Sequence, residues 1–190
     1  MKKRILTVLL AVYMALTLTA CGAKKDEVGT FGATSNKLID ALRQDLETKG
    51  YGDMFVKDPE AEKIAAEGGA PKALRRSYFA PGMVFEIYSL AENDEVYQAV
   101  LMVEKTELKT GQEKQSLDVM LDLFTSGFEK REREKLYENL SLPDTEDGID
   151  KQAKGTEANW VYFVEDGFLM ISATSLDYVA SVYEGEYDQR

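Results

Sequence analysis

The sequence of 190 residues contains no histidine and a single cysteine, Cys21. The absence of histidine removes the commonest general base and the commonest zinc ligand, which excludes Ser-His-Asp catalysis and histidine-ligated zinc. With one cysteine no disulfide can form within the chain, so the fold must depend on packing. Basic residues are also scarce, 23 against 34 acidic ones, and the net charge of −11 argues against affinity for nucleic acid or for anionic lipid surfaces.

The first 21 residues have the three parts of an export signal. Lys2, Lys3 and Arg4 precede a run of 16 uncharged, mostly apolar residues, 5–20, which ends at Cys21. A spanning helix needs about 20 residues, so a secretory signal is favoured over a bilayer-spanning anchor. Two alternatives are an ordinary signal peptide with an incidental cysteine and an uncleaved N-terminal anchor.

The last four residues of this segment, Leu18-Thr19-Ala20-Cys21, resemble the lipobox of bacterial lipoproteins. The resemblance implies that a type II signal peptidase cuts between Ala20 and Cys21, and that the Cys21 thiol carries a diacylglyceryl group. Two acyl chains are enough for stable anchoring. Residues 1–20 are therefore expected to be a lipoprotein signal peptide, and the mature protein to lie on the extracytoplasmic face of the cell membrane. The residue after Cys21, Gly22, does not decide whether the cell envelope has one membrane or two.

Removal of residues 1–20 takes away three basic residues and no acidic ones, so the mature chain of 170 residues has a net charge of −14. Residues 21–35 are interpreted as the lipidated cysteine and a flexible polar tether. Residues 36–190 have the length of a single domain, which we expect to be α+β.

The N-terminal part of the domain is predicted to be helical. Ser35 is a plausible N-cap for an amphipathic helix that ends at Gly50, and Asp58-Pro59 is expected to begin a short helix that ends at Gly68-Gly69. Residues 70–82 and 141–158 are punctuated by proline and glycine, and both are expected to be irregular.

Two β-hairpins are predicted in the rest of the domain. Runs at 83–90 and 96–106 form the first, and runs at 159–164 and 168–173 flank Asp166-Gly167, a type I′ turn signature. An apolar face over 117–128, followed by the charged run 129–135, predicts a helix after the first hairpin. A helix capped by Ser175 follows the second.

The expected fold is therefore one four-stranded antiparallel sheet made of two β-hairpins, each followed by a helix, with the N-terminal helices packed on the sheet. This layout is loosely similar to that of small uncharacterised lipoproteins of anaerobic Gram-positive bacteria. The likeness is one of pattern and implies no activity.

Lys72, Arg75, Arg76 and Tyr78 form the only basic cluster of the mature chain without nearby acids in sequence. Arginine suits recognition of carboxylate or phosphate groups, and loops often carry binding residues, so these four residues are a candidate binding patch. The alternative is that they pair with acids elsewhere on the surface, or that they begin an edge strand.

No metal site, cofactor or catalytic residue is predicted. The acidic loop 144–150 does not match an EF-hand, because Gly148 falls at the fifth position from Asp144. No serine–lysine pair has the Ser-x-x-Lys spacing, and no pair of carboxylates is singled out among the acids.

The sequence therefore predicts a lipid-anchored, non-catalytic binding or interaction module of the cell envelope. Its expected partners are the membrane, through the lipid on Cys21, and another envelope protein, but not nucleic acid. The alternatives are a small-ligand (solute) binding lipoprotein, for which 170 residues are few, and a histidine-free envelope enzyme.

Overall fold

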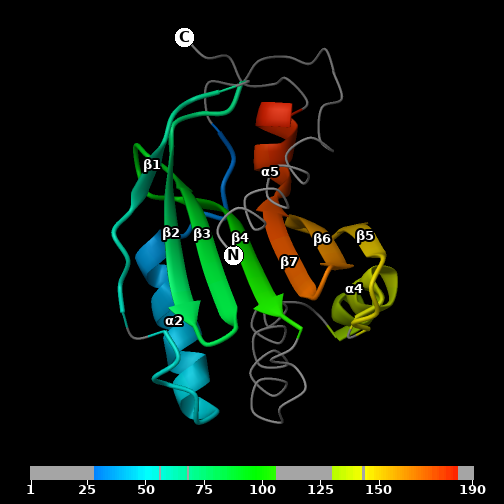
Figure 1. The fold of residues 1–190 in the computed structure, drawn as a ribbon. Coiled ribbons are helices and arrows are strands. Elements are labelled where there is room, and N and C mark those ends of the chain that lie inside the picture. Colours follow the sequence, from blue (N-terminus) through cyan, green and yellow to red (C-terminus); the bar gives the residue numbers. More distant parts are fainter. Residues whose placement is uncertain (1–27, 56, 68, 106–129, 143, 184–190) are drawn as a thin grey trace.

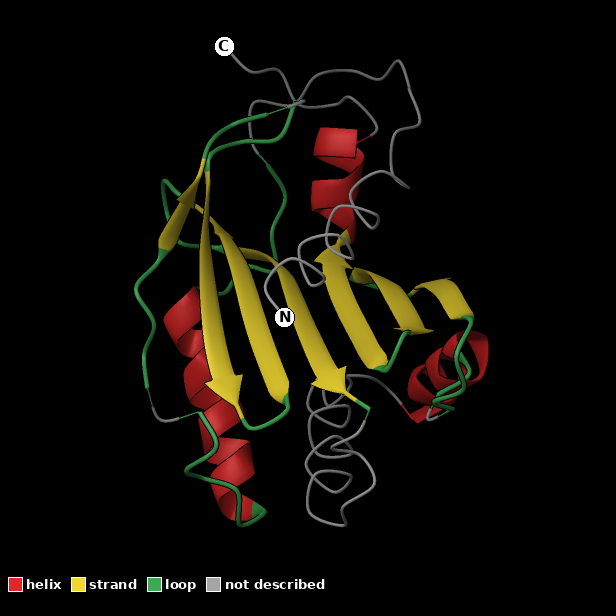
Figure 2. Ribbon diagram, in the orientation of Figure 1, coloured by secondary structure: helices red, strands yellow, loops and turns green. Residues whose placement is uncertain are grey.

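The computed structural model of the protein describes residues 28–55, 57–67, 69–105, 130–142 and 144–183. Within these ranges the chain forms one seven-stranded antiparallel sheet and three α-helices (Figure 1, Figure 2). The strands are β1 (Glu62–Ile64), β2 (Ala73–Ala80), β3 (Met83–Leu90), β4 (Val96–Glu104), β5 (Ile149–Lys154), β6 (Ala158–Glu165) and β7 (Phe168–Ser175). The helices are α2 (Ser35–Thr48), α4 (Lys130–Leu140) and α5 (Leu176–Tyr178), which continues as the π-helical turn η2 (Val179–Tyr183).

The prediction of a four-stranded α+β sheet is wrong, because the sheet has seven strands in the order β1-β2-β3-β4-β7-β6-β5 and dominates the fold. The runs predicted as two hairpins form β3, β4, β7 and β6, which are neighbours in the centre. β4 and β7 pair from Gln98↔Thr174 to Glu104↔Phe168 and join the two hairpins. Three strands that the sequence did not predict, β1, β2 and β5, extend this centre at both sides.

β2 occupies most of a segment that was predicted to be irregular. Its eight residues pair with β3 from Ala73↔Leu90 to Ala80↔Met83. Pro71 and Pro81 lie outside its two ends, where a missing N–H removes no hydrogen bond from the strand ladder. The prolines therefore mark the limits of a strand, and not the interior of a loop.

The outermost strands are polar, and β1 is also short. β1 replaces the helix predicted to begin at Asp58-Pro59, and β5 lies inside 141–158, which was predicted to be a loop. Each has a neighbouring strand on one side only. An edge strand exposes much of its surface to water, so it does not need the apolar alternation by which a strand is recognised in a sequence.

α2 begins close to its predicted start but is capped differently. Thr34, not Ser35, is the N-cap residue, and its side chain makes no capping hydrogen bond. Ser35 is the first helical residue and is fully buried. The apolar face is confirmed, because Ile39, Leu42 and Leu46 are all buried.

α2 and α4 pack on the same face of the sheet. Their buried leucines and Ile39 share one core with alternate residues of the strands. One row of that core crosses five neighbouring strands through opposed partners, namely Tyr78, Phe85, Leu101, Ile171 and Tyr162. Burial of each large apolar side chain contributes about 1.5–3 kcal/mol, so this row is a major source of stability.

The second predicted hairpin and its following cap are confirmed. Asp166 and Gly167 have φ angles of 51° and 83°, and they connect β6 to β7. The Ser175 hydroxyl accepts a hydrogen bond from the Tyr178 N–H at 3.4 Å. The helix predicted over 117–128 lies outside the described residues, and the charged run 129–135 enters α4 at Lys130.

We expect Gly167→Ala to lower the free energy of unfolding by about 1–2 kcal/mol, because an L residue is strained in the left-handed region. Asp166→Gly is the matched control, since it relieves the same kind of strain at the neighbouring position. Urea denaturation of the purified variants measures both values. Equal stability of Gly167→Ala and the unmodified chain would show that this turn does not restrain the hairpin.

Candidate functional site

The four residues of the predicted binding patch lie on or just before β2. Lys72 is exposed and precedes the strand. Tyr78 is 2% exposed and belongs to the main core under α2. Since side chains alternate along a strand, Arg75 points to the opposite face from Arg76 and Tyr78. The structure therefore does not gather these four side chains on one surface.

Arg76 lies in a hydrogen-bonded network that joins three elements. Its Nη1 donates to Oδ1 of Asp94 at 2.6 Å, to Oγ of Ser35 at 2.9 Å and to Oγ of Ser89 at 3.3 Å. Both serine hydroxyls also donate to the same Asp94 oxygen, at 2.9 Å from Ser35 and 2.8 Å from Ser89. β2, the end of β3, the β3–β4 turn and the first residue of α2 are thereby held together, so Arg76 has a structural role.

The network gives Asp94 an unusual conformation and an unusual acidity. Its φ angle is 60°, in a region that few non-glycine residues occupy, and aspartate is among those that do. Burial by itself would raise the pKa of the Asp94 carboxyl, but the hydrogen bonds from Ser89, Ser35 and Arg76 and the charge of Arg76 lower it below its usual value. Asp94 is therefore a strongly held anion in the folded protein.

Arg75 takes part in a second polar cluster, on the face of the sheet opposite α2. Its guanidinium forms an ion pair with Glu62 of β1. Burial alone would lower the pKa of Arg75, but the hydrogen bond to Glu62 and the charge of Glu86 raise it. Burial and the adjacent Glu86 carboxylate raise the pKa of the Tyr88 hydroxyl, so Arg75 stays cationic and Tyr88 stays protonated at neutral pH.

Glu86 is the buried anion of this second cluster. It is 5% exposed, and its two oxygens accept hydrogen bonds from Ser77 at 2.9 Å and from Tyr88 at 2.6 Å. A carboxylate that accepts a proton from a serine hydroxyl could in principle activate that hydroxyl as a nucleophile. Here both carboxylate oxygens are already occupied and the group is out of contact with solvent, so the arrangement orders the sheet face.

Two rows of side chains cross this opposite face from strand to strand. The polar row consists of Arg75, Tyr88, Gln98, Thr174, Asn159 and Lys154, each opposite the next in register. Gln98 donates to Thr174 at 3.0 Å within it. The apolar row lies nearer the β2–β3 and β6–β7 turns and consists of Phe79, Val84, Met102, Met170 and Phe163.

Phe79 begins the apolar row. Its side chain is 72% exposed, and among the described residues it is the large apolar side chain that lies in solvent. It lies on the outer half of β2, Arg76–Ala80, which we call the β2 edge. β1 pairs only with residues 73–75, and in the described ranges no strand pairs with the β2 edge on its outer side. Continuing the β1 register would place Pro59 opposite Tyr78, and a proline has no N–H for the ladder.

The sequence analysis did not identify Phe79. A detectable signal was present, because Arg75, Ser77 and Phe79 alternate with Arg76, Tyr78 and Ala80 in the period of a strand. Assignment of the segment as a loop concealed that alternation. Once β2 is recognised, Phe79 falls on the face opposite α2, where an aromatic residue is conspicuous.

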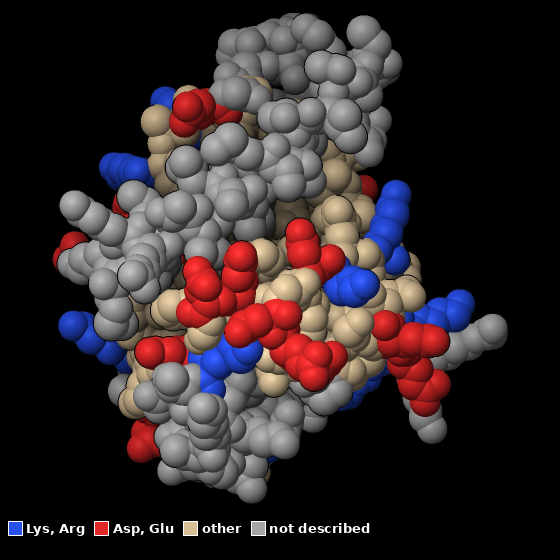
Figure 3. Space-filling view, turned by 45° about the vertical axis from the view of Figure 1, so that its right-hand side comes forward, with Lys and Arg blue, Asp and Glu red and all other residues tan. Residues whose placement is uncertain are grey.

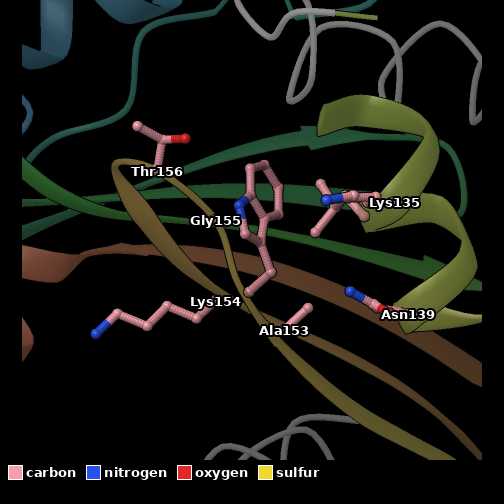
Figure 4. Close-up of a pocket in the computed structure, with 8 residues that line it drawn as sticks. Lys135, Asn139, Ala153, Lys154, Gly155 and Thr156 are labelled. Carbon is pink, nitrogen blue, oxygen red and sulfur yellow. The ribbon is translucent and has the colours of Figure 1, made fainter. Parts of the chain in front are cut away.

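A pocket of about 260 Å³ lies between α4 and the β5–β6 turn. Lys135 and Asn139 extend into it from α4, and Gly155 and Thr156 form the turn (Figure 4). Trp160 also lines the pocket. The Lys154 ammonium points away from the other lining groups in the same view. The pocket therefore offers an amide, a hydroxyl and one cation beside an indole ring, which suits a small polar or anionic molecule.

The acidic loop is occupied by internal contacts. The Asp144 carboxylate accepts from the Glu146 N–H at 3.1 Å, and Asp147 pairs with Lys105 at 2.8 Å. The Tyr162 hydroxyl donates to the Asp144 carbonyl at 2.5 Å. In the parts of the chain that the structure describes, no three His, Cys, Asp or Glu side chains are arranged to hold a metal ion.

Ala20 and Cys21 lie outside the described residues. Across the described ranges, no helix is long and apolar enough to cross a membrane.

We expect Asp94→Asn to lower the free energy of unfolding at pH 7 by about 1.5–3 kcal/mol, because it weakens a hydrogen bond to a charged partner. Since folding lowers the pKa of Asp94, the stabilisation from its ionised form is present at neutral pH and is lost as the pH falls below about 4. The difference between variant and unmodified protein should therefore shrink between pH 7 and pH 3. Urea titrations at several pH values measure it.

Asp58→Asn is the matched control for this experiment. Asp58 also pairs with an arginine, Arg43, at 2.8 Å, but its side chain is largely exposed, so its loss should cost less than about 1 kcal/mol. Equal effects of the two variants at pH 7 would contradict the structural role assigned to Asp94.

No protein family, curated protein or solved structure matches this chain. A functional assignment therefore depends on the chemistry of its own side chains.

Proposed function

We propose that the protein is a bacterial lipoprotein, anchored through Cys21 on the extracytoplasmic face of the cell membrane, and that its domain is a non-catalytic interaction module. The anchor is supported by the sequence of the leader, where a positive start and a 16-residue apolar run end in Leu18-Thr19-Ala20-Cys21. A type II signal peptidase would cut after Ala20, and the thiol of Cys21 would be consumed by the lipid. The two acyl chains would hold the mature domain at the membrane.

The β2 edge is the observation that supports an interaction role. It combines an exposed aromatic side chain, Phe79, with a stretch of strand backbone that has a neighbour on one side only. Natural sheets commonly protect such edges with charged residues or with a covering segment. β5, at the other edge, follows that rule with Asp150, Lys151 and Lys154, whereas the β2 edge ends in Phe79 and Ala80.

The partner that fits the β2 edge is an extended segment of another envelope protein. Such a segment can add to the sheet through main-chain hydrogen bonds and place an apolar side chain against Phe79 and Val84. Val84 is the neighbour of Phe79 on β3 and is half-buried. Acidic side chains gather on one face of the domain (Figure 3), and the mature chain has a net charge of −14, so the complementary segment is neutral or basic.

The pocket at Trp160 supports a second candidate, a lipoprotein that binds a small solute. Lys135 and Asn139 supply a cation and an amide at its wall. A cavity of this size admits a molecule smaller than most drug-sized ligands, whose pockets exceed about 300 Å³. The exposed edge is the stronger feature, because the pocket is smaller than the usual range of ligand sites.

Cys21→Ala tests the anchor. The variant should lose the mass of the lipid, keep its leader uncleaved by the type II peptidase, and fail to incorporate labelled fatty acid. Thr19→Ser is the matched control, since it keeps a small hydroxylated residue at the second position before the lipid-bearing cysteine and should be processed normally. Recovery of Cys21→Ala in the membrane fraction at the mature mass would contradict the lipid anchor.

In-cell photocrosslinking tests the interaction role. A photoreactive phenylalanine analogue at position 79 should capture one dominant envelope protein, and the same analogue at Phe163 should not, although both belong to the apolar row. Phe79→Ser should weaken capture from a neighbouring reporter by about tenfold, because truncation of an aromatic anchor typically costs more than 1 kcal/mol. Equal patterns at 79 and 163 would exclude the β2 edge.

The two arginines of β2 are unsuitable for this experiment. Arg76 is part of the Asp94 network and Arg75 pairs with Glu62, so reversing either charge would disturb the fold itself. Loss of a partner in those variants would not identify a contact surface. Lys72→Glu is the informative charge reversal, because the Lys72 side chain is exposed and the hydrogen bond that Lys72 accepts from the Ala91 N–H belongs to the backbone and is kept in the variant.

A further inference from the structure

The first described residue, Val28, already packs against the rest of the domain. Val28 is 6% exposed and packs in a small apolar cluster at one end of the sheet. The other members of that cluster come from β2, β3, β4, α5, η2 and the β1–β2 turn, and they are Ala70, Ala73, Leu90, Tyr97, Tyr178 and Val182. Tyr97 and Tyr178 stack in it with ring centroids 4.0 Å apart.

The residues after Val28 are fixed equally firmly. The Phe31 N–H donates to the Val96 carbonyl and the Val96 N–H donates to the Ala33 carbonyl, both at 2.8 Å. The Thr30 hydroxyl donates to the Glu95 carboxylate at 2.7 Å. Gly29 passes so close to Asp177 that a Cβ at this position would lie 2.1 Å from that of Asp177. The described part of the predicted tether, 28–35, therefore belongs to the folded body.

The chain between the lipid and this attachment point is short. Cys21 and Val28 are seven residues apart. Even fully extended, seven residues span about 25 Å, and a random coil of that length has a root-mean-square reach of about 15 Å. The attachment point therefore stays near the bilayer surface whenever Cys21 carries its lipid.

The sheet is longer than this reach. β4 begins in the Val28 cluster and ends beside the β6–β7 turn, since Glu104 pairs with Phe168. Its nine residues rise about 26 Å, and the turn adds a few more. A domain that stood upright on its β6–β7 turn would hold Val28 about 30 Å above the bilayer, farther than a seven-residue tether allows, so that inverted orientation is excluded.

We infer that the lipid anchor holds the domain with its Val28 end toward the membrane and presents its β2–β3 and β6–β7 turns, with the exposed Phe79, to partners that lie away from the bilayer. This inference rests on the lipid anchor of the proposed function. In Figure 1 the first described residues and α5 lie at one end of the strands, and the β6–β7 turn lies at the other. Phe79 is opposite Val84, next to the β2–β3 turn. It therefore belongs to the end of the sheet that is opposite the Val28 cluster, which we call the outer end.

The occupant of the outer end is therefore a protein segment and not a lipid surface. The charge of the domain points the same way, because a mature chain with a net charge of −14 is repelled by anionic headgroups. With the strands upright on the bilayer, a partner that contacts Phe79 extends about 30 Å from it, as the periphery of another envelope protein does.

Two single-cysteine reporters test the orientation in the lipidated protein. Glu92→Cys lies in the β3–β4 turn, at the Val28 end, and Glu165→Cys lies at the β6–β7 turn; both glutamates are exposed. Cys21 is the only native cysteine and its thiol is consumed by the lipid, so a maleimide fluorophore labels the reporter alone. The labelled proteins are reconstituted into phosphatidylcholine–phosphatidylglycerol vesicles that contain a trace of rhodamine-labelled lipid.

We expect energy transfer to the bilayer to be at least about twofold greater from position 92 than from position 165, given a separation of about 26 Å along the strands. Insertion of about 20 Gly/Ser residues between Glu27 and Val28 should reduce this difference, because the tether then reaches about 29 Å on random-coil scaling. Equal or reversed transfer in the lipidated protein would overturn the orientation alone. Absence of lipid on Cys21, shown by mass spectrometry of the N-terminal peptide, would overturn the anchor and the orientation together.

Discussion

The carboxylate of Asp94 is the junction on which the rest of the structure depends. One of its oxygens accepts hydrogen bonds from Ser35, Ser89 and Arg76, which belong to α2, β3 and β2. These bonds fix the start of α2 relative to the sheet, and the apolar face of the helix then covers the core. A chain without disulfides has to hold its elements in register by such contacts, and here one partly buried carboxylate with three donors performs that task.

The two faces and the two edges of the sheet consequently differ. α2 and α4 cover one face, while the other carries a polar row, an apolar row and the Glu86 cluster. One edge ends in β5, which carries Asp150, Lys151 and Lys154, and the other leaves Phe79 and a stretch of backbone with which no strand of the described residues pairs on the outer side. Under the proposed lipid anchor and interaction role, this asymmetry would direct a partner to one corner of the molecule, at the end of the sheet opposite the short link from Val28 to Cys21.

The sequence was sufficient for the elements whose apolar pattern reflects burial. Ile39, Leu42 and Leu46 defined α2, and Asp166-Gly167 defined the last hairpin, because helix period and turn chemistry are local properties. β1 and β5 were missed because edge strands are selected for solubility and carry charges in place of an alternating pattern, whereas β2 was missed because Pro71 and Pro81 made its segment look irregular. Arg76 looked unpaired because its acid, Asp94, is distant in sequence, and only the pairing of β2 with β3 brings the two together.

The sheet order also has a consequence for how the chain assembles. β1 to β4 are consecutive in sequence and in space, as are β5 to β7, and the two halves of the sheet are joined where β4 pairs with β7. Because a chain is synthesised from its N-terminus, one half can form before the other emerges. Until β7 arrives, β4 is itself an open edge, and closing it requires contacts between residues about 70 positions apart, such as Gln98 and Thr174. The slow and aggregation-sensitive step of folding is therefore expected to be the pairing of β7, the last strand to emerge, with β4.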